Sequence, residues 1–426
     1  MNEKITESAR ELEVRDHADI LVAGGGIAGI AAALAAARTG SRVLLIEKEW
    51  MLGGLATLGL ITIYLPLCDG KGRQVIYGIG EELLKLSIKY GAEDGEFPLP
   101  RPWLEGGSLQ EKQKLRYQVQ YHPWLFAICA EQLLKEAGVE ILYGTSVCAV
   151  ILNDKRIEAL VIENKSGRSA LMVKAVVDAT GDADICKQSG VKTEQFGRGN
   201  VLASWHYSFS EGRVQLRIAG YAEAPEQPGA GRNEAAEGGE RGLSKRRFTG
   251  LDGKELSEMT EASHKALLNI VEKERLQHPD YFPVTAPLIP QIRMTRRISG
   301  EYTLDESEAL VHFDDSIGLT GDWRKPGPVF EIPYRTLYSR EIKNLICAGR
   351  CISVTDPMWD ISRVIPPCAV TGQAAGTAAA LALQGQKEAG GGIDFFQLAA
   401  AELQQKLSAD GVLIHLKDID IHNGKT

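Results

Sequence analysis

Short apolar runs separated by glycine-rich or polar residues open the chain. Residues 20–23 and 43–46 are continuous apolar runs, which predict two buried strands. Between them, residues 30–38 are rich in alanine and are followed by Gly40, a pattern typical of a helix and its end. The pattern therefore predicts a strand–helix–strand unit over residues 18–47.

Later segments follow two other patterns. Residues 146–173 alternate between apolar and polar positions, with turn signals at 153–154 and 165–167, which predicts a β-meander. An apolar run at 175–177 continues into Gly181 and predicts a further strand. Segments with helical periodicity lie at 79–90, 122–137, 256–276, 370–383 and 395–407.

The character of the chain changes near residue 200. Residues 223–250 are rich in Gly, Glu, Ala and Arg, which predicts a long loop. We predict an α/β fold, in which a Rossmann-like domain with a parallel sheet and a β-meander is interrupted by an α+β substrate (cap) domain. The expected parts are an N-terminal arm (1–17), the nucleotide-binding domain (18–200 and 336–392), the cap (201–335) and a C-terminal helix and tail (393–426).

Composition narrows the class of protein. The chain has 426 residues and a net charge of −8, which argues against a nucleic-acid-binding surface. Its N-terminus is densely charged, and no apolar run approaches the ~20 residues of a membrane span. We therefore expect neither a signal peptide nor a membrane partner.

The seven cysteines stand singly in the sequence, without C-x-x-C spacing. This pattern predicts a reduced, cytoplasmic protein without a disulfide framework. Cys347 and Cys351 are four residues apart with no histidine cluster beside them, so we expect no metal site there. Cys68, beside an aspartate in a glycine turn, is either a redox thiol or a buried, inert cysteine.

The first predicted turn carries a nucleotide-binding pattern. Gly24, Gly26 and Gly29 have the G-x-G-x-x-G spacing, and Glu47 ends the second predicted strand eighteen residues later. In this pattern the glycines allow a tight turn, close approach of a pyrophosphate and tight helix packing. The helix N-terminus offers N–H groups to the phosphates, and the acidic residue accepts ribose hydroxyls. The segment predicts a dinucleotide site.

Three further stretches favour FAD over a nicotinamide cofactor. They are the pair Gly53-Gly54, the strand end at residues 178–182, and Ala348-Gly-Arg350 followed by the glycine-containing helix start at 371–376. A nicotinamide cofactor does not need the last of these three stretches. FAD does need it, because the flavin ring lies far from the adenine. A helix N-terminus aimed at the flavin stabilises negative charge on the reduced ring.

These motifs together resemble the FAD-dependent oxidoreductases of the glutathione-reductase-like superfamily, near the fumarate-reductase-type flavoproteins. The resemblance extends over about residues 18–416 and includes the segments 296–302 and 331–335. It implies that FAD contacts Gly24, Gly26, Ala28, Gly29, Glu47, Lys48, Gly53, Gly54, Val147, Ala179, Thr180, Gly181, Gly349, Arg350, Thr371, Gly372 and Gln373.

The chain departs from this family in one position. Many relatives have Gly-Asp where this sequence has Gly349-Arg350, so a cation replaces the acceptor expected for the ribityl chain. No second G-x-G-x-x-G follows a predicted strand, so we expect no separate NAD(P)H domain. Electrons are then expected to pass directly between the flavin and an external acceptor or donor.

Three residues are candidates for substrate chemistry. Arg363 precedes the helix expected to face the flavin, where it either binds a substrate carboxylate or pairs with Asp360. His206 lies on a predicted strand and is either a proton-transfer residue or a core histidine. Arg335, like Arg296 and Arg297, either lines the same cleft or forms a structural ion pair.

The expected function is hydride transfer between a small organic substrate and flavin N5. The alternatives are a flavin monooxygenase, and a non-catalytic flavoprotein that serves electron transfer or RNA modification.

Overall fold

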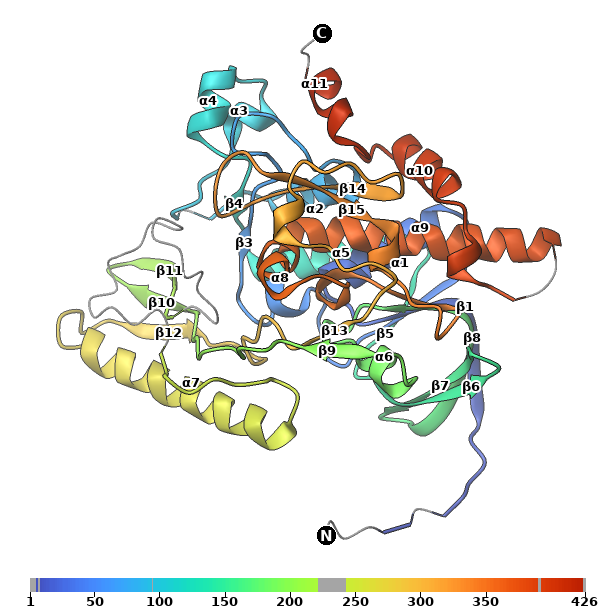
Figure 1. Cartoon of the computed structure of the whole chain (residues 1–426). Coiled ribbons are helices and arrows are strands. Elements are labelled where there is room, and N and C mark those ends of the chain that lie inside the picture. The colour runs from blue at the N-terminus through green and yellow to red at the C-terminus, as the bar shows by residue number, and fades with distance from the viewer. Residues whose placement is uncertain (1–4, 7, 94, 221–242, 390–391, 424–426) are drawn as a thin grey trace.

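The computed structural model describes residues 5–6, 8–93, 95–220, 243–389 and 392–423 (Figure 1). Most of the predicted loop at 223–250 lies outside these residues. Within them, seven strands form the largest sheet, in the order β5-β2-β1-β8-β7-β6, with β16 paired to β8. Its strands are β1 (Val14–Ala23), β2 (Val43–Ile46), β5 (Glu140–Leu142), β6 (Ser146–Asn153), β7 (Arg156–Asn164), β8 (Gly167–Asp178) and β16 (Leu345–Cys347).

The long strand β8 joins two kinds of pairing. Its first residues pair antiparallel with β7, which in turn pairs with β6, and this is the predicted meander. Its last residues, Val176 to Asp178, pair in parallel with β16. β1 pairs in parallel with both β2 and β8 and begins at Val14, so the end of the predicted N-terminal arm belongs to the sheet.

Both faces of the central strands are buried, which explains their continuous apolar runs, whereas the outer strands β5 and β6 are partly exposed. Ile20 and Val22 of β1 pack into one hydrophobic core, and Leu21 and Ala23 pack into a second core on the opposite face. Successive side chains of a strand point to opposite faces, so a single strand needs apolar residues at every position here. The parallel α/β architecture follows from this burial.

Two helices with small side chains cover the first face. α1 (Ile27–Arg38) crosses α9 (Ile365–Ala389), and the two lie together in the middle of the molecule (Figure 1). A Cβ on Gly372 would lie 2.3 Å from the carbonyl oxygen of Ala28, and one on Gly376 would lie 2.0 Å from that of Ala32. The alanines and glycines of both helices therefore permit a very close crossing.

The start of α9 corrects the predicted helix at 370–383. The helix begins at Ile365, five residues before the predicted segment, and includes Pro366 and Pro367 in its first turn. Proline is tolerated in the first turn, because the N–H groups there have no partner within the helix. Thr371 therefore lies inside the helix and not at its first turn.

The inserted segment forms a separate layer. It contains β10 (His206–Ser210), β11 (Arg213–Arg217), β12 (Phe282–Thr285) and α7 (Gly253–Glu274). Figure 1 shows this sheet and α7 on the side of the molecule away from the meander β6–β8. The antiparallel pair β9 (Thr193–Gln195) and β13 (Arg296–Ile298) lies where the chain enters and leaves it.

The chain after β13 returns to the main body. The antiparallel pair β14 (Ser316–Gly321) and β15 (Val329–Pro333) packs on α9, although both strands lie within the predicted cap at 201–335. Other elements are β3 (Ile63–Tyr64), β4 (Val119–Gln120), α2 (Gly78–Ser87), α3 (Arg101–Leu104), α4 (Leu109–Lys114), α5 (Pro123–Glu136), α6 (Asp184–Gln188), α8 (Asp356–Ser362), α10 (Ala400–Ala409) and α11 (Ile419–His422). Among the described residues, no helix is both long and apolar enough to cross a membrane.

Candidate active site

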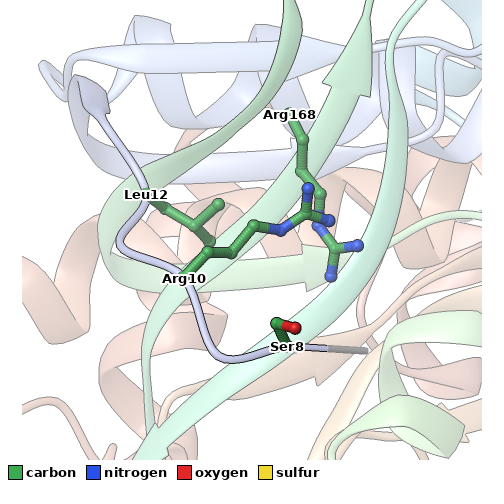
Figure 2. Close-up of a pocket in the computed structure, with 4 residues that line it drawn as sticks. All are labelled: Ser8, Arg10, Leu12 and Arg168. Atoms are coloured by element: carbon green, nitrogen blue, oxygen red, sulfur yellow. The ribbon is translucent and has the colours of Figure 1, made fainter. Parts of the chain in front are cut away.

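A cavity of about 2140 Å³ lies at the carboxyl ends of the parallel strands, the edge at which open α/β sheets bind ligands. Residues directly after β1, β2, β8 and β16 line it, together with residues of the cap. A second hollow, formed by Ser8, Arg10, Leu12 and Arg168 beside β8, measures about 180 Å³ (Figure 2). Ligand pockets usually measure ~300–1,000 Å³, so only the larger cavity has room for a dinucleotide and a substrate.

The glycine turn between β1 and α1 has the shape of a phosphate-binding loop. Gly24 has φ +102°, and a Cβ on Gly29 would lie 1.8 Å from the Gly24 carbonyl oxygen. Both residues must therefore be glycine. A Cβ on Gly26 would meet no atom within 4 Å, so this position opens into the cavity. No side chain caps the first turn of α1, which leaves its N–H groups for an anion.

Glu47 lies beside this turn and is buried. One of its carboxylate oxygens accepts the Gly25 N–H at 2.6 Å, and the other accepts the Glu49 N–H at 2.9 Å. Burial raises the pKa of Glu47, while these two backbone hydrogen bonds act in the opposite direction. Glu47 and Val147, at the start of β6, both line the cavity. The arrangement suits a ribose and its adenine.

Two more loops complete this part of the wall. Gly53 pairs with Gly26 and donates its N–H to the Gly25 carbonyl at 2.8 Å, which places the Gly53-Gly54 loop against the glycine turn. Arg350 lies over Gly181, where a Cβ would approach its guanidinium to 2.4 Å. The predicted cofactor residues on the cavity wall are Gly24, Gly26, Ala28, Glu47, Lys48, Gly53, Gly54, Val147, Ala179, Thr180, Gly181 and Arg350.

The remaining predicted cofactor residues do not line the cavity. The Thr371 hydroxyl accepts the Gly349 N–H at 3.0 Å, and the Gln373 side chain accepts the Ile79 N–H at 2.9 Å. Gly29 and Gly372 serve the packing of α1. The start of α9 still reaches the cavity, through Ile365 and Cys368.

Three arginines converge on another part of the wall. Arg363 lines the cavity and pairs with Asp360, with 3.1 Å between its Nε and the Oδ1 atom. Arg350 pairs with Asp182 at 3.3 Å and donates to the backbone carbonyl of Arg293. The pair with Asp360, one of the two alternatives for Arg363, is thus present, and Arg363 also lines the cavity, so binding of a substrate carboxylate stays a prediction.

Arg293 is the residue that the sequence did not indicate. It lines the cavity, is only 6% exposed and lies over the ring of Trp205 at 5.3 Å. Burial lowers its pKa, and the neighbouring charges of Arg363 and Arg350 lower it further. Among the described residues, no carboxylate forms a salt bridge with Arg293, and its guanidinium donates to the Gln291 carbonyl at 3.1 Å. No pattern distinguishes it from Arg296 and Arg297 in the sequence.

The other catalytic candidates lie away from the cavity. His206 is fully buried in the cap, where its ring nitrogens contact the Ser204 carbonyl and the Tyr281 hydroxyl at 2.9 and 2.8 Å. Burial lowers its pKa. Arg335 pairs with Asp315 at 2.9 Å. Cys68 is buried, and burial raises the pKa of its thiol, so its environment does not favour the reactive thiolate.

The motifs on this cavity are those of a recognised family. The family model described as FAD dependent oxidoreductase matches residues 19–202 and 249–407. The chain belongs to the FAD-dependent oxidoreductase family. Its cofactor is FAD, and the open space at Gly26, the uncapped start of α1 and the Glu47 acceptor all fit that cofactor.

The similarity to individual proteins is partial or distant. A thioredoxin reductase of Ureaplasma parvum serovar 3 is 36% identical over 78 residues, which are 18% of this oxidoreductase and 25% of that relative. The chain therefore matches about a quarter of the length of this curated relative. The p-nitrophenol 4-monooxygenase of Pseudomonas putida DLL-E4 shares 13% identity over 96% of this chain and 92% of that chain, with a TM-score of 0.46. A geranylgeranyl bacteriochlorophyll reductase-like protein of Thermoplasma acidophilum shares 12% identity over 96% of this chain and 94% of that chain, with a TM-score of 0.43.

Proposed function

We propose that this FAD-dependent oxidoreductase transfers hydride between a small organic anion and its flavin, with Arg293 and Arg363 binding the anion. The observation that carries the proposal is the position of Arg293. Its guanidinium is buried on the cavity wall, and no carboxylate of the described residues forms a salt bridge with it, although the charge of Asp360 acts on it from a distance. A buried cation is costly unless it is paired, so the site favours an anionic ligand.

The geometry suits a carboxylate. A guanidinium binds both oxygens of a carboxylate through two parallel hydrogen bonds and so holds it in one orientation. Arg116, also on the cavity wall, donates to the Trp323 carbonyl at 2.7 Å, and its buried Nε has no hydrogen-bond partner among the described residues. This further cation on the cavity wall supports a substrate with more than one acidic or polar group.

Each protein group has a defined task in this proposal. Arg293 and Arg363 fix the substrate, while Trp205 and Ile292 from the cap exclude water from the same wall. FAD supplies or accepts the hydride when it is bound. Orientation matters because a misplacement of about 1 Å can cost ~100-fold in rate.

Two finer assignments belong to the same proposal. We place the chain in the glutathione-reductase-like superfamily, near the fumarate-reductase-type flavoproteins; the meander inserted between β5 and β16 in sequence supports this placement. We also propose that a separate small molecule donates or accepts the electrons, because the sequence contains a single G-x-G-x-x-G after a strand.

A screen of small carboxylates, phosphates and neutral analogues tests the function. Flavin bleaching under anaerobic conditions identifies substrates, and stopped-flow measurements then give the reduction rate of Arg293→Lys and Arg363→Lys. Each variant keeps the charge but loses the planar fork. We expect both to bind FAD normally and to be reduced about 100-fold more slowly than the parent.

Arg297→Lys is the matched control. Arg297 is also buried, but it pairs with Asp356 at 2.7 Å and does not line the cavity, so this variant should be reduced at the parent rate. Parent-like reduction of both Arg293→Lys and Arg363→Lys would remove the arginines from the site. If Arg363→Ala only lowers the melting temperature, then its pair with Asp360 is structural. Bleaching by neutral analogues alone would contradict an anionic substrate.

A further inference from the structure

Two histidines and a buried glutamate meet on the side of the molecule formed by β14, β15 and the C-terminal segment. His312 lies between the 3-10 turn η2 (Glu306–Glu308) and β14, Glu331 lies in the middle of β15, and His415 precedes the 3-10 turn η6 (Leu416–Asp418). The Nδ1 atoms of His312 and His415 each lie 3.2 Å from Oε2 of Glu331. None of the three residues lines the FAD cavity.

The carboxylate of Glu331 is held firmly in this cluster. Its side chain is fully buried. Oε2 accepts the Phe313 N–H at 2.7 Å, and Oε1 accepts the Leu416 N–H at 2.9 Å. These two bonds fix the orientation of the carboxylate, so that its remaining lone pairs face the two imidazole rings.

The two carboxylate contacts of His312 suit a positive charge at the ring, either a second proton or a metal ion at Nδ1. Its Nε2 lies 3.2 Å from Oδ1 of Asp314, while its Nδ1 faces Glu331. A neutral imidazole has a single N–H, so it can donate to only one of these two carboxylates. When Nε2–H donates to Asp314, the Nδ1 lone pair points at a carboxylate oxygen. A metal ion between these two atoms turns this repulsive contact into two coordination bonds.

The spacing of the donor atoms is that of a metal site. Zinc binds imidazole nitrogen and carboxylate oxygen at 2.0–2.2 Å, which puts neighbouring ligand atoms of a tetrahedral site about 3.3 Å apart. Both distances to Glu331 are 3.2 Å, and the three ligand atoms all lie within 4.8 Å of one another. A small rotation of the His312 side chain, which is 55% exposed, closes the remaining gap.

We propose that His312, Glu331 and His415 bind a divalent metal ion of the zinc class. The ligand set of two imidazoles and a carboxylate is one that zinc uses, and solvent at the exposed side supplies the fourth position. Asp314 then acts as the outer carboxylate that orients a metal-bound histidine. The ion ties the C-terminal segment to β15 and to the loop before β14, so its binding stabilises the fold at this point.

Zinc binding by the FAD-loaded full-length protein tests this site. After chelator treatment and desalting, titration calorimetry and elemental analysis should show one zinc per chain. We expect His312→Gln and His415→Gln to lose this binding, and Asp314→Asn to weaken it by about 10-fold or more. The melting temperature of the parent should rise with added zinc, whereas that of His415→Gln should not.

His278→Gln is the matched control, because His278 pairs with Glu211 at 3.3 Å and no third metal-binding side chain of the described residues joins them. This variant should bind zinc like the parent. An unchanged visible flavin spectrum shows that each variant is folded. Two results would overturn the proposal: a parent protein that binds no stoichiometric zinc, or equal binding in the parent and in a His312→Gln, His415→Gln double variant. The cluster would then be a hydrogen-bonded pair of histidines on a buried glutamate.

Discussion

Single charged residues define the two halves of the cavity. Glu47 offers acceptors beside the glycine turn, and Arg293 and Arg363 offer donors on another part of the wall. Each is held in place by partners of its own: backbone N–H groups for Glu47, Trp205 for Arg293 and Asp360 for Arg363. A ligand therefore meets groups whose orientation is already set, and binding does not have to order them.

At the scale of single residues, Glu47→Gln should weaken FAD binding. Both carboxylate oxygens of Glu47 accept backbone N–H groups, and the amide of glutamine replaces one of these acceptors with a donor. Loss of a charged acceptor costs ~1.5–3 kcal/mol, which corresponds to ~10- to 150-fold in affinity. Equilibrium titration of the apoprotein with FAD measures the effect.

The matched control for this titration is Glu49→Gln. Glu49 lines the same cavity, but its contact with Glu47 uses the backbone N–H, which the substitution retains. This variant should bind FAD as the parent does. Equal affinities for the parent and Glu47→Gln would show that Glu47 does not contact the cofactor.

At the scale of elements, the crossing of α1 and α9 positions the cavity. α1 carries the glycine turn at its start, and the first turn of α9 carries Ile365 and Cys368 to the cavity wall. The short distance between the two helices brings these starts to the same ligand. The glycines in the Thr371–Gly376 segment are explained by this crossing, because a side chain there would meet the backbone of α1.

Gly376→Ala should destabilise the protein through this crossing. The added Cβ would lie 2.0 Å from the Ala32 carbonyl oxygen, so one helix must shift. Overpacking of this kind costs ~1–3 kcal/mol of unfolding free energy. Gly385→Ala is the control in the same helix, because its Cβ meets nothing within 4 Å. Gly385→Ala should stabilise the protein by ~0.5–1 kcal/mol. Urea unfolding of both variants at saturating FAD measures the two changes in unfolding free energy. Similar stabilities for the two variants would contradict the close crossing.

At the scale of the whole molecule, distant segments share one cavity. Its wall is built from the N-terminal strand–helix–strand unit, the cap, the turn at 323–326 and the start of α9. A ligand in the cavity therefore links parts of the chain that are more than 300 residues apart. Its binding free energy stabilises those segments against local opening.

Removal of FAD should loosen this wall selectively. We expect faster amide hydrogen exchange in residues 24–30, 179–185 and 289–293 of the apoprotein, because these segments line the cavity. The pair β14 and β15 should change little, apart from its connecting turn. Exchange followed by mass spectrometry, with and without FAD, makes the comparison. A uniform increase over the whole chain, β14 and β15 included, would show that FAD stabilises the protein only globally.

The sequence alone determined the nucleotide-binding half of this protein. The glycine turn, Glu47, the parallel strands and the meander are each encoded by neighbouring residues, because a phosphate-binding turn and a strand are local structures. FAD as the cofactor, the FAD-dependent oxidoreductase family and the α/β fold were predicted from the sequence and are confirmed, whereas the placement near the fumarate-reductase-type flavoproteins stays a proposal. The contacts of the individual cofactor residues stay predictions.

The tertiary structure decided the roles of residues whose partners lie far along the chain. Gly376 packs on Ala32, His206 is enclosed by the cap, and α9 starts at Ile365 because two prolines fit its first turn. Arg293 differs from Arg297 only in what surrounds it: the cavity for one and an acidic pair for the other. Burial and ion pairing depend on contacts between segments that are distant in sequence, and no local pattern of residues encodes such contacts.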